Sequence, residues 1–346
     1  MLYNSIHPGK VWLDTKGERI QAHGGSILYH DNRFYWYGEN KEKSQSEYEI
    51  WHWGVRLYSS TDLYNWEDEG IICFPEPDNP DSPMHPTSKM DRPHIIYNEK
   101  NKRFVMWMKI MAELPYIMVA LSDSIHGPFV LSHKIQPQGF GVGDFDLVKD
   151  PETGKAVIIF ERVHSSLIVM DLNDDYTNVT DHYTEHMVKG RPPYVREAPA
   201  VFRKDNKWYL FTSGTTAKFP NPTETAVADS LHGPWTELGI THVNDTKKTS
   251  FDSQISAVLQ HPKHPSLYIA IADRWLIDLK PDLPDMIKVF DSWFDPKKED
   301  LISKDIRLLT AKNTAMADYV WLPVLFREDG TPELRWMDEW KIEDFI

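Results

Sequence analysis

The stretch Ser59-Ser60-Thr61-Asp62-Leu63-Tyr64-Asn65-Trp66 recurs in altered form at two later points of the chain. The later copies are Leu121-Ser122-Asp123-Ser124-Ile125-His126-Gly127-Pro128-Phe129 and Ala228-Asp229-Ser230-Leu231-His232-Gly233-Pro234-Trp235. Each copy is a short polar turn that ends on an aromatic residue, and each follows a segment of alternating apolar and polar residues. Because one copy cannot bury its own hydrophobic face, this repetition indicates a supersecondary unit that is used several times.

Short runs typical of β-strands surround these turns along the whole chain. They are rich in Val, Ile, Tyr, Phe and Trp, and turn residues such as Asp205-Asn206 and Asp329-Gly330 separate them. No segment keeps an apolar period of 3.6 residues, so we expect few and short helices. The predicted strands are Gly25–Tyr29, Phe34–Tyr37, Val55–Tyr58, Ile95–Tyr97, Phe104–Lys109, Ile117–Leu121, Ala156–Phe160, Ser166–Asp171, Ala200–Phe202, Trp208–Thr212, Ala226–Ala228, Ser256–Leu259, Leu267–Ala272, Val320–Phe326 and Glu333–Trp336.

Polar motifs precede strands of one type at five places. These motifs are Gln21-Ala22-His23-Gly24-Gly25, Asp91-Arg92-Pro93, Asp144-Phe145-Asp146, Glu197-Ala198-Pro199 and Asp252-Ser253-Gln254. Five units of four antiparallel strands predict an all-β fold, a five-bladed β-propeller, because radial repetition leaves only short sheet edges. We expect residues 1–346 to form this propeller as a single domain. A β-sandwich competes with it, but gives no reason for polar motifs at matching places.

Composition excludes several classes of partner. The net charge of −14 argues against nucleic acid and against anionic membranes. Cys73 is the only cysteine, so no intrachain disulfide and no cysteine metal cluster can form. The start, Met1 to Lys10, lacks an apolar signal region, and no apolar run approaches the ~20 residues that span a bilayer. We therefore expect a cytoplasmic protein, unless a leader has been removed.

The strand-start motifs carry the candidate chemistry, because the innermost strands of a propeller begin around one end of its axis. Glu197 precedes the apolar run Ala198–Val201, where partial loss of water would raise its pKa and keep it protonated. Asp144 and Asp146 are alternate residues, so both can lie on one face of a strand. A carboxylate near Glu197 would raise its pKa further. The plainer alternatives are a surface Glu197 and an Asp144 that caps a turn.

Several motifs in register resemble glycoside hydrolase family 43, and most closely its exo-β-1,3-galactanase branch. The resemblance runs from Gly9 to Trp340 and implies a five-bladed propeller that cleaves with inversion. The motifs that carry it are Gln21-Ala22-His23-Gly24-Gly25, Phe34-Tyr35-Trp36-Tyr37-Gly38-Glu39-Asn40, Asp91-Arg92-Pro93, Glu197-Ala198-Pro199, Ser253-Gln254 and Asp273-Arg274-Trp275.

The resemblance implies roles for the catalytic residues. Glu197 would be the general acid, Asp144 the carboxylate that tunes its pKa, and Gln254 the residue that holds the attacking water. The family's usual base is an aspartate in the first blade, where this chain has Gln21 and His23 instead. An amide is a poor base, so Gln254 would need an imidic-acid tautomer or another proton acceptor. His23 is the alternative base; a structural role or binding of an axial ion is the other reading of this residue.

The resemblance also implies substrate-binding residues. Glu39 and Asp91 would recognise sugar hydroxyl groups, and Arg92 would hold a carboxylate through its planar guanidinium. Thr215, Gln21 and His23 would line the same site, while Lys218 stands where an aromatic platform is expected. The candidates for stacking on a sugar ring are Trp51, Trp53, Tyr116, Trp275 and Trp321.

These residues predict an exo-acting hydrolase that releases terminal galactose from β-1,3-galactan-type oligosaccharides. The same fold supports β-xylosidases and α-L-arabinofuranosidases through loop variation, so these activities stay open. A non-catalytic carbohydrate-binding propeller follows if the absent base is decisive, and a protein-interaction propeller is a third alternative. We expect an oligosaccharide partner and no cofactor, with a structural calcium ion on the axis as an open alternative. The sequence does not fix the oligomeric state.

Overall fold

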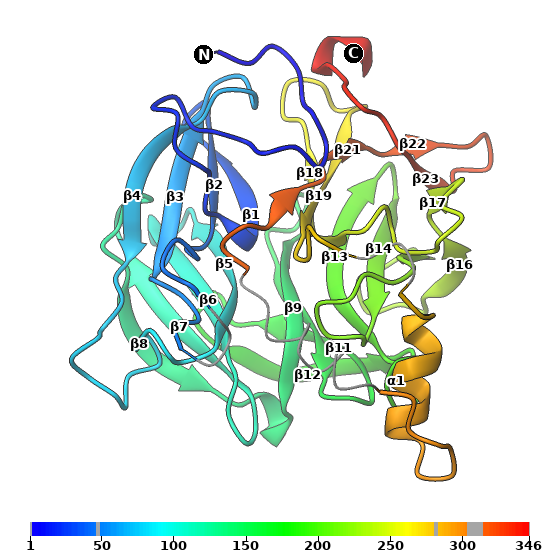
Figure 1. Cartoon of the computed structure of the whole chain (residues 1–346). Helices are drawn as coiled ribbons and strands as arrows, with labels where there is room; N and C mark the ends of the chain where they lie inside the picture. Colours follow the sequence, from blue (N-terminus) through cyan, green and yellow to red (C-terminus); the bar gives the residue numbers. More distant parts are fainter. Residues whose placement is uncertain (1, 46–48, 280–282, 303–313, 346) are drawn as a thin grey trace.

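Sheets of antiparallel strands radiate from a central axis and form an all-β propeller (Figure 1). The computed structural model describes residues 2–45, 49–279, 283–302 and 314–345. One α-helix, α1 (Met286–Phe294), lies beside the sheets, and two 3₁₀ turns span Pro137–Gly139 and Ile342–Phe345. The low helix content predicted from the missing 3.6-residue period is therefore confirmed for these residues.

Each large sheet follows the chain as a simple meander, and the strands fall into the following groups. The first sheet contains β1 (His23–His30), β2 (Arg33–Glu39), β3 (Val55–Ser60) and β4 (Glu67–Cys73). The second contains β5 (Met90–Asn98), β6 (Arg103–Ile110), β7 (Tyr116–Ser122) and β8 (Val130–Ile135). The third contains β9 (Val142–Lys149), β10 (Ala156–Arg162), β11 (Ser166–Leu172) and β12 (Val179–His186). The fourth contains β13 (Arg196–Lys204), β14 (Lys207–Gly214), β15 (Glu224–Ala228) and β16 (Thr236–Ile240).

The last part of the chain builds two smaller sheets. One contains β18 (Gln254–Gln260), β19 (Tyr268–Arg274), β20 (Asp318–Tyr319) and β21 (Leu322–Pro323). The other contains β17 (His242–Val243), β22 (Leu325–Phe326) and β23 (Pro332–Arg335). The described residues thus form six sheets, and the predicted count of five is wrong. The extra sheet escaped prediction because β17 and β22 are only two residues long and β23 pairs with β17 in parallel, far from it in sequence.

The first strands of the four large sheets and β18 face one another around the axis. β1 contacts β5, β5 contacts β9, β9 contacts β13, β13 contacts β18, and β18 returns to β1. All of these strands start from the predicted polar motifs. The beginnings of the innermost strands are thereby collected at one end of the axis, which we call the mouth.

Apolar side chains fill the spaces between neighbouring sheets. Trp36, Trp66 and Trp321 pack together between the first and the fifth sheet, with ring centroids 4.6–6.0 Å apart. Full burial of large apolar side chains stabilises a fold by about 1.5–3 kcal/mol each. Because Trp321 is 0% exposed, it belongs to the core. The prediction that it stacks on a sugar is wrong, since sequence alone did not separate core tryptophans from surface ones.

The repeated turn phrases all connect the third and fourth strands of a sheet, and each docks its aromatic end into apolar packing. In the first copy, Asp62 accepts backbone N–H groups from Tyr64 and Asn65 at 2.8 Å, which is a typical Asx turn. In the other copies, His126 lies 3.4 Å from Glu69 and His232 lies 2.7 Å from Asp171, each on the preceding sheet. The repeated phrase is therefore a device that ties neighbouring sheets together.

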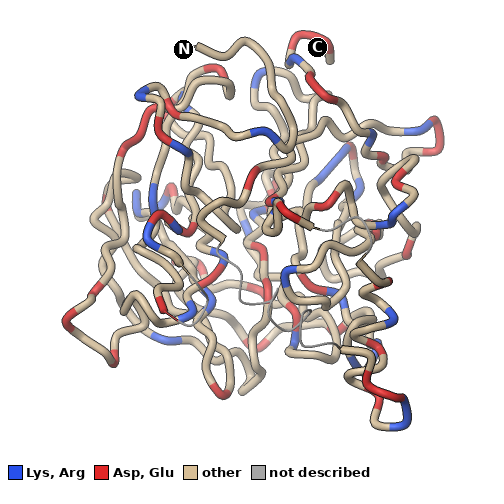
Figure 2. The backbone as a smooth tube through the Cα atoms, in the orientation of Figure 1, with Lys and Arg blue, Asp and Glu red and all other residues tan. Residues whose placement is uncertain are grey.

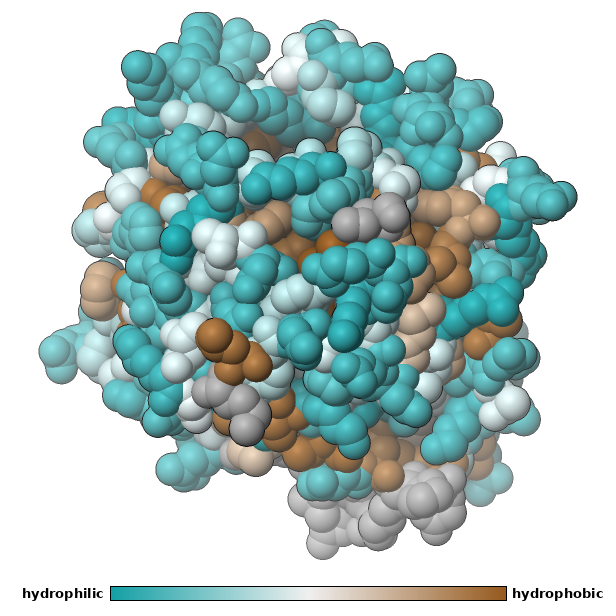
Figure 3. Space-filling view, turned by 90° about the horizontal axis from the view of Figure 1, so that it is seen from above, coloured by the Kyte–Doolittle hydropathy of each residue, from teal (hydrophilic) through white to brown (hydrophobic). Residues whose placement is uncertain are grey.

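The surface is mostly polar. Acidic and basic residues are interspersed over the whole molecule (Figure 2), and the face seen from above shows apolar residues in patches between hydrophilic ones (Figure 3). In the part of the chain that the structure describes, no helix combines the length and apolar character that crossing a membrane requires.

Candidate active site

Register shifts and left-handed residues at the starts of three inner strands set the direction of the polar side chains there. The pairing register shifts between His23 and Ser26 on β1, between Asp91 and His94 on β5, and between Glu197 and Ala200 on β13. In each case the residue after the polar one is left-handed, with φ of 60° at Gly24, 53° at Arg92 and 48° at Ala198. Bulges next to active sites redirect side chains, and left-handed non-glycine residues store backbone strain. At these three strand starts the local geometry therefore changes the direction in which the polar side chains point.

Gln254 lies at the centre of the residues that meet at the mouth. Its Oε1 accepts from Arg92 Nη2 at 2.6 Å and from Trp275 Nε1 at 3.4 Å. Its Nε2 donates to Glu197 Oε1 at 3.2 Å and to Ser213 Oγ at 2.8 Å. Because a guanidinium only donates, the oxygen of the amide must face Arg92. Gln254 thus bridges the candidate acid to the cationic side of the mouth.

Asp144 lies in a network of buried charges. Its Oδ2 is 2.9 Å from Arg92 Nη2, and its Oδ1 is 2.9 Å from Lys109 Nζ. Lys109 also reaches Asp91 Oδ2 at 3.1 Å. All four side chains are buried, so each charge depends on its partners for the stabilisation that water would otherwise give. The network places the predicted residues Asp91, Arg92 and Asp144 side by side.

The same charges separate the pKa values of two carboxyl groups. Burial and the nearby Asp144 carboxylate raise the pKa of Glu197 well above its usual range. Burial alone would raise the pKa of Asp144 as well, but Arg92 and Lys109 outweigh it and hold this pKa below its usual range. A protonated carboxyl group beside an ionised one is the arrangement that general acid catalysis requires.

Glu39 forms the first-sheet side of the mouth. Its Oε1 accepts the backbone N–H of Arg92 at 3.0 Å, and its Oε2 is 2.8 Å from Lys41 Nζ. Burial raises the pKa of Glu39 to about 7, although Lys41 opposes this shift. A side chain at Gly24 would place its Cβ 2.6 Å from Glu39 Oε1, so only glycine lets β1 pass here. Glu39 is therefore fixed between the first two sheets.

His23, the first residue of β1, is enclosed by protein and not open to the mouth. It is 0% exposed, its Nδ1 is 3.1 Å from Asp273 Oδ1, and its Nε2 is 3.1 Å from Gln21 Oε1. Its ring stacks on Tyr319 with centroids 5.1 Å apart, and burial lowers its pKa. Both ring nitrogens thus have partners within the protein. This environment favours a structural role for His23 over that of a base. It also favours a structural role for Gln21 over substrate binding, because its amide is buried and contacts His23 and the carbonyl of Ala315.

The aromatic candidates occupy different environments. Trp275 lines a pocket at the mouth together with Ser213, Gln254 and Lys218. The indole of Trp51 donates to Asp91 Oδ1 at 2.8 Å, so it borders the charge network.

The remaining candidates are less open to a sugar ring. Lys218, which stands where an aromatic platform is expected, has its ammonium 5.0 Å from the centroid of the Trp51 ring. Lysine ammonium groups cover the rings of Trp53 and Tyr116 at 3.4 and 4.0 Å. Thr215 is buried, and its hydroxyl donates to the carbonyl of Val195 at 3.4 Å. Ammonium groups also lie over Trp51, at 4.2 Å for Lys41 and 5.0 Å for Lys89, so Trp275 remains as the candidate stacking residue.

Sequence reasoning missed three residues that hold the mouth together, namely Lys41, Lys109 and Ser213. Lys109 carried a usable signal, because it is the one charged side chain inside the apolar run Phe104–Met111. A lysine buried in such a run needs an anionic partner. Lys41 and Ser213 had no comparable signal, since both sit in polar surroundings in the sequence.

A propeller whose mouth joins a protonated carboxyl group, an ionised one and an amide defines a protein suited to hydrolyse glycosidic bonds. The family model of glycosyl hydrolases family 43 matches residues 18–277. The chain therefore belongs to glycoside hydrolase family 43. The comparison with curated proteins found no match.

Solved structures of this family are similar to the chain over nearly its whole length. A GH43 β-1,3-galactosidase has a TM-score of 0.79 at 27% identity, over 99% of this chain and 64% of that chain. The chain thus spans less than two thirds of that relative's length. A second GH43 β-1,3-galactosidase, with galactodeoxynojirimycin, has a TM-score of 0.79 at 27% identity, over 97% of this chain and 100% of that chain. An exo-β-1,3-galactanase from Clostridium thermocellum has a TM-score of 0.76 at 25% identity, over 97% and 66%.

Proposed function

We propose that this protein is an exo-acting β-1,3-galactosidase or galactanase that cleaves with inversion. The observation that carries the proposal is the bridge from Glu197 through Gln254 to Arg92, which sets an acid of raised pKa beside a fixed amide. The similar structures described as β-1,3-galactosidase and exo-β-1,3-galactanase support the choice of sugar and linkage.

In this proposal Glu197 gives its proton to the glycosidic oxygen as the bond to the anomeric carbon breaks, and water attacks that carbon from the other side. Asp144 keeps Glu197 protonated by like-charge repulsion. Gln254 orients the water once the sugar has displaced its hydrogen bond to Glu197. Its oxygen already accepts from Arg92 in the amide form, which favours a positioning role over that of a base. The proton of the attacking water is therefore released to bulk water.

Substrate hydroxyl groups would meet Glu39, Asp91 and Arg92. Nη1 of Arg92 is buried and has no hydrogen-bond partner among the described residues, so it would gain one if a substrate hydroxyl group reached it. Trp275 would stack on the ring, because it lines the pocket next to Gln254.

The test is galactose release from β-1,3-galactotriose, with NMR of the first product to read its anomeric configuration. We expect wild type to release the inverted sugar and Glu197→Gln to lose activity about 10³-fold, since general acids contribute about 10²–10⁴-fold. The control is Glu237→Gln on the exposed outer strand of the same sheet, which should act like wild type. Equal rates for Glu197→Gln and wild type would remove Glu197 from the acid role.

Two other outcomes would replace the proposal. Preferred hydrolysis of nitrophenyl β-xyloside or α-L-arabinofuranoside would assign another sugar. Tight calorimetric binding of galactotriose without turnover would favour a carbohydrate-binding propeller, the reading suggested by Gln21 at the place of the usual basic aspartate.

A further inference from the structure

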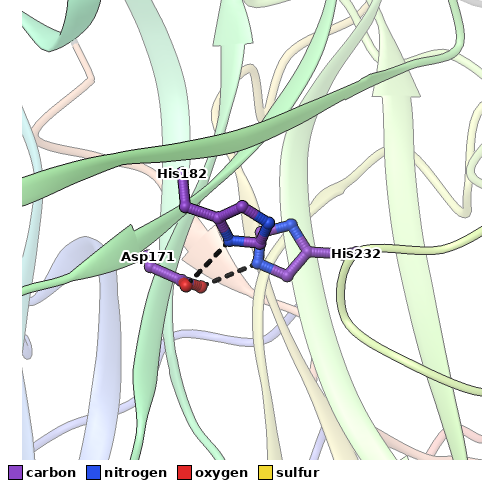
Figure 4. Close-up of side chains that lie close together, drawn as sticks. All are labelled: Asp171, His182 and His232. Atoms are coloured by element: carbon purple, nitrogen blue, oxygen red, sulfur yellow. Dashed lines mark hydrogen bonds and ion pairs between the residues drawn. The ribbon is translucent and has the colours of Figure 1, made fainter.

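A cluster of two imidazoles and one carboxylate joins the third sheet to the fourth. Asp171 lies on β11, His182 on β12, and His232 in the turn between β15 and β16. Asp171 Oδ2 is 2.9 Å from His182 Nδ1, and Oδ1 is 2.7 Å from His232 Nε2. Figure 4 shows both rings turned toward the same carboxylate.

The cluster is separate from the mouth. Asp171 pairs with Val157, which pairs with Val148 on the innermost strand β9. Val148 is further along β9 than Asp144, and β11 and β12 lie on the outer side of the sheet. The cluster is thus at the outer edge of the third sheet, toward the end away from the mouth.

The repeated turn phrase gives an internal comparison. His126 holds the position in the second copy that His232 holds in the third. It faces a single carboxylate, with Nδ1 3.4 Å from Glu69. One imidazole therefore suffices to dock such a turn on the preceding sheet. The additional imidazole of His182, whose ring centroid is 4.3 Å from that of His232, calls for another explanation.

The chemistry of the three groups points to a metal ion. Their ligand atoms lie within 4.8 Å of one another. Two imidazole nitrogens and one carboxylate oxygen suit zinc and its neighbours among the transition metals, whereas calcium and magnesium prefer oxygen ligands alone. In a tetrahedral site the bonds from zinc to the nitrogen and oxygen ligands are about 2.0–2.1 Å long. To reach this geometry, the distances from the Asp171 oxygens to the two imidazole nitrogens would have to increase by roughly half an ångström. His182, whose side chain is 63% exposed, can move by this amount.

The surroundings of His232 also resemble those of a metal ligand. Its second nitrogen, Nδ1, is 3.0 Å from Thr184 Oγ1, which in turn contacts His186 Nε2 at 2.8 Å. Histidine ligands are commonly oriented by such a hydrogen bond from the other ring nitrogen. The exposed side of the cluster leaves room for a water molecule as the fourth ligand.

We propose that Asp171, His182 and His232 form a binding site for a divalent transition-metal ion, with zinc as the principal candidate. The ion takes the place of the protons that the imidazoles now share with the carboxylate. It clamps the turn between β15 and β16 to the third sheet. Its role is therefore structural, and it does not take part in the chemistry at the mouth.

The test is calorimetric titration of zinc chloride into the full chain, without a histidine tag and after treatment with a chelator. We expect one zinc ion per chain and a melting temperature that rises by roughly 3–6 °C at a hundredfold excess over the dissociation constant. His182→Ala should weaken binding about 10- to 100-fold. It is the first choice because its side chain is largely exposed, so the variant should fold. His126→Ala is the matched control and should bind as wild type does.

Other outcomes would overturn the site. Zinc that binds equally to wild type and His182→Ala would exclude these ligands. Loss of binding in His264→Ala instead would move the ion to the pair His261 and His264, whose ring centroids are 4.7 Å apart. No zinc binding by wild type would leave the cluster as a hydrogen-bonded tie between two sheets. An equal shift of the melting temperature with magnesium would contradict the preference for nitrogen ligands.

Discussion

Asp144 and Asp146 are alternate residues of the same strand and both are buried, but their pKa values shift in opposite directions. Asp144 contacts Arg92 and Lys109, which lower its pKa. Asp146 lines the channel further along β9, where burial raises its pKa to about 7. His94 Nε2 lies 3.4 Å from Asp146 Oδ1, and burial lowers the pKa of His94 to about 4.

The two aspartates show how neighbouring groups set the charge of buried acids at two depths of one channel. At the mouth, cations keep Asp144 ionised, and its charge acts on Glu197. Deeper in the channel, Asp146 and His94 are both uncharged between about pH 4 and 7, because Asp146 keeps its proton and His94 does not take one. Burial is therefore common to both sites, and the neighbouring cations decide the outcome.

The largest effect should follow from removing the cation at the mouth. Lys109→Met leaves Asp144 and Asp91 with one buried cation fewer. We expect a loss of about 3–5 kcal/mol in the free energy of unfolding, and an Asp144 that behaves more like Asp146. Urea denaturation and galactose release measure the two effects. Lys134→Met, an exposed change on β8 of the same sheet, is the control, and similar stability of both variants would contradict the charge network.

Removing the carboxylate itself should have the next largest effect. Asp144→Asn abolishes the like-charge repulsion that helps to raise the pKa of Glu197. We expect turnover to fall by about 10²-fold. The alkaline limb of the profile of kcat/KM against pH should move to lower pH, because Glu197 would lose its proton earlier. A lower rate with an unmoved limb would mean that Asp144 only supports the structure.

Much of this comparison could be predicted from the sequence, because alternation of apolar and polar residues is a local property. This alternation predicted the inner strands and the polar residues at their starts. It thereby also predicted that Glu197, Asp144 and Gln254 lie close together. The outermost strands were missed. β8, β12 and β16 are largely exposed or half-buried, and β4 is buried only at Ile72 and Cys73, so no continuous buried face imposes an apolar pattern on them.

Contacts between distant segments could not be predicted in the same way. The predicted strand Val320–Phe326 is split into β21 and β22, which join different sheets. Lys109 meets Asp144 only after two sheets pack together. His23 looked like a candidate base by its position at a strand start, but its partner Asp273 lies 250 residues away in the sequence. Such features depend on packing and not on local pattern.

Substitutions of two tryptophans should distinguish the mouth from the core. Trp275→Ala should raise KM about tenfold, the equivalent of about 1.4 kcal/mol, because the indole lines the pocket and donates to Gln254. Trp321→Phe should lower the free energy of unfolding by about 1–2 kcal/mol and leave KM unchanged, because this side chain is wholly in the core. A raised KM in Trp321→Phe would place the core cluster in contact with the substrate.

The smallest effect on turnover should follow from Asp146→Asn, although it changes stability. The pKa of Asp146 in the folded protein, about 7, is above the value of about 3.9 for an unfolded chain. The folded state therefore holds an extra proton between these values, and wild type should lose stability as the pH rises through this window. Asn cannot ionise, and its oxygen can still accept the Val201 N–H that Asp146 Oδ2 accepts at 2.8 Å.

Asp146→Asn should accordingly be the more stable protein at pH 8, by a margin on the order of 4 kcal/mol at most, and should match wild type near pH 4. Urea denaturation at both pH values measures this difference, and Asp205→Asn in an exposed turn serves as control. Glu39, whose pKa is also raised to about 7, titrates in both proteins and cancels in the comparison. If the difference in the free energy of unfolding did not depend on pH, Asp146 would be ionised over the whole range. Asp144 and Asp146 would then differ in their position relative to the mouth and not in their charge.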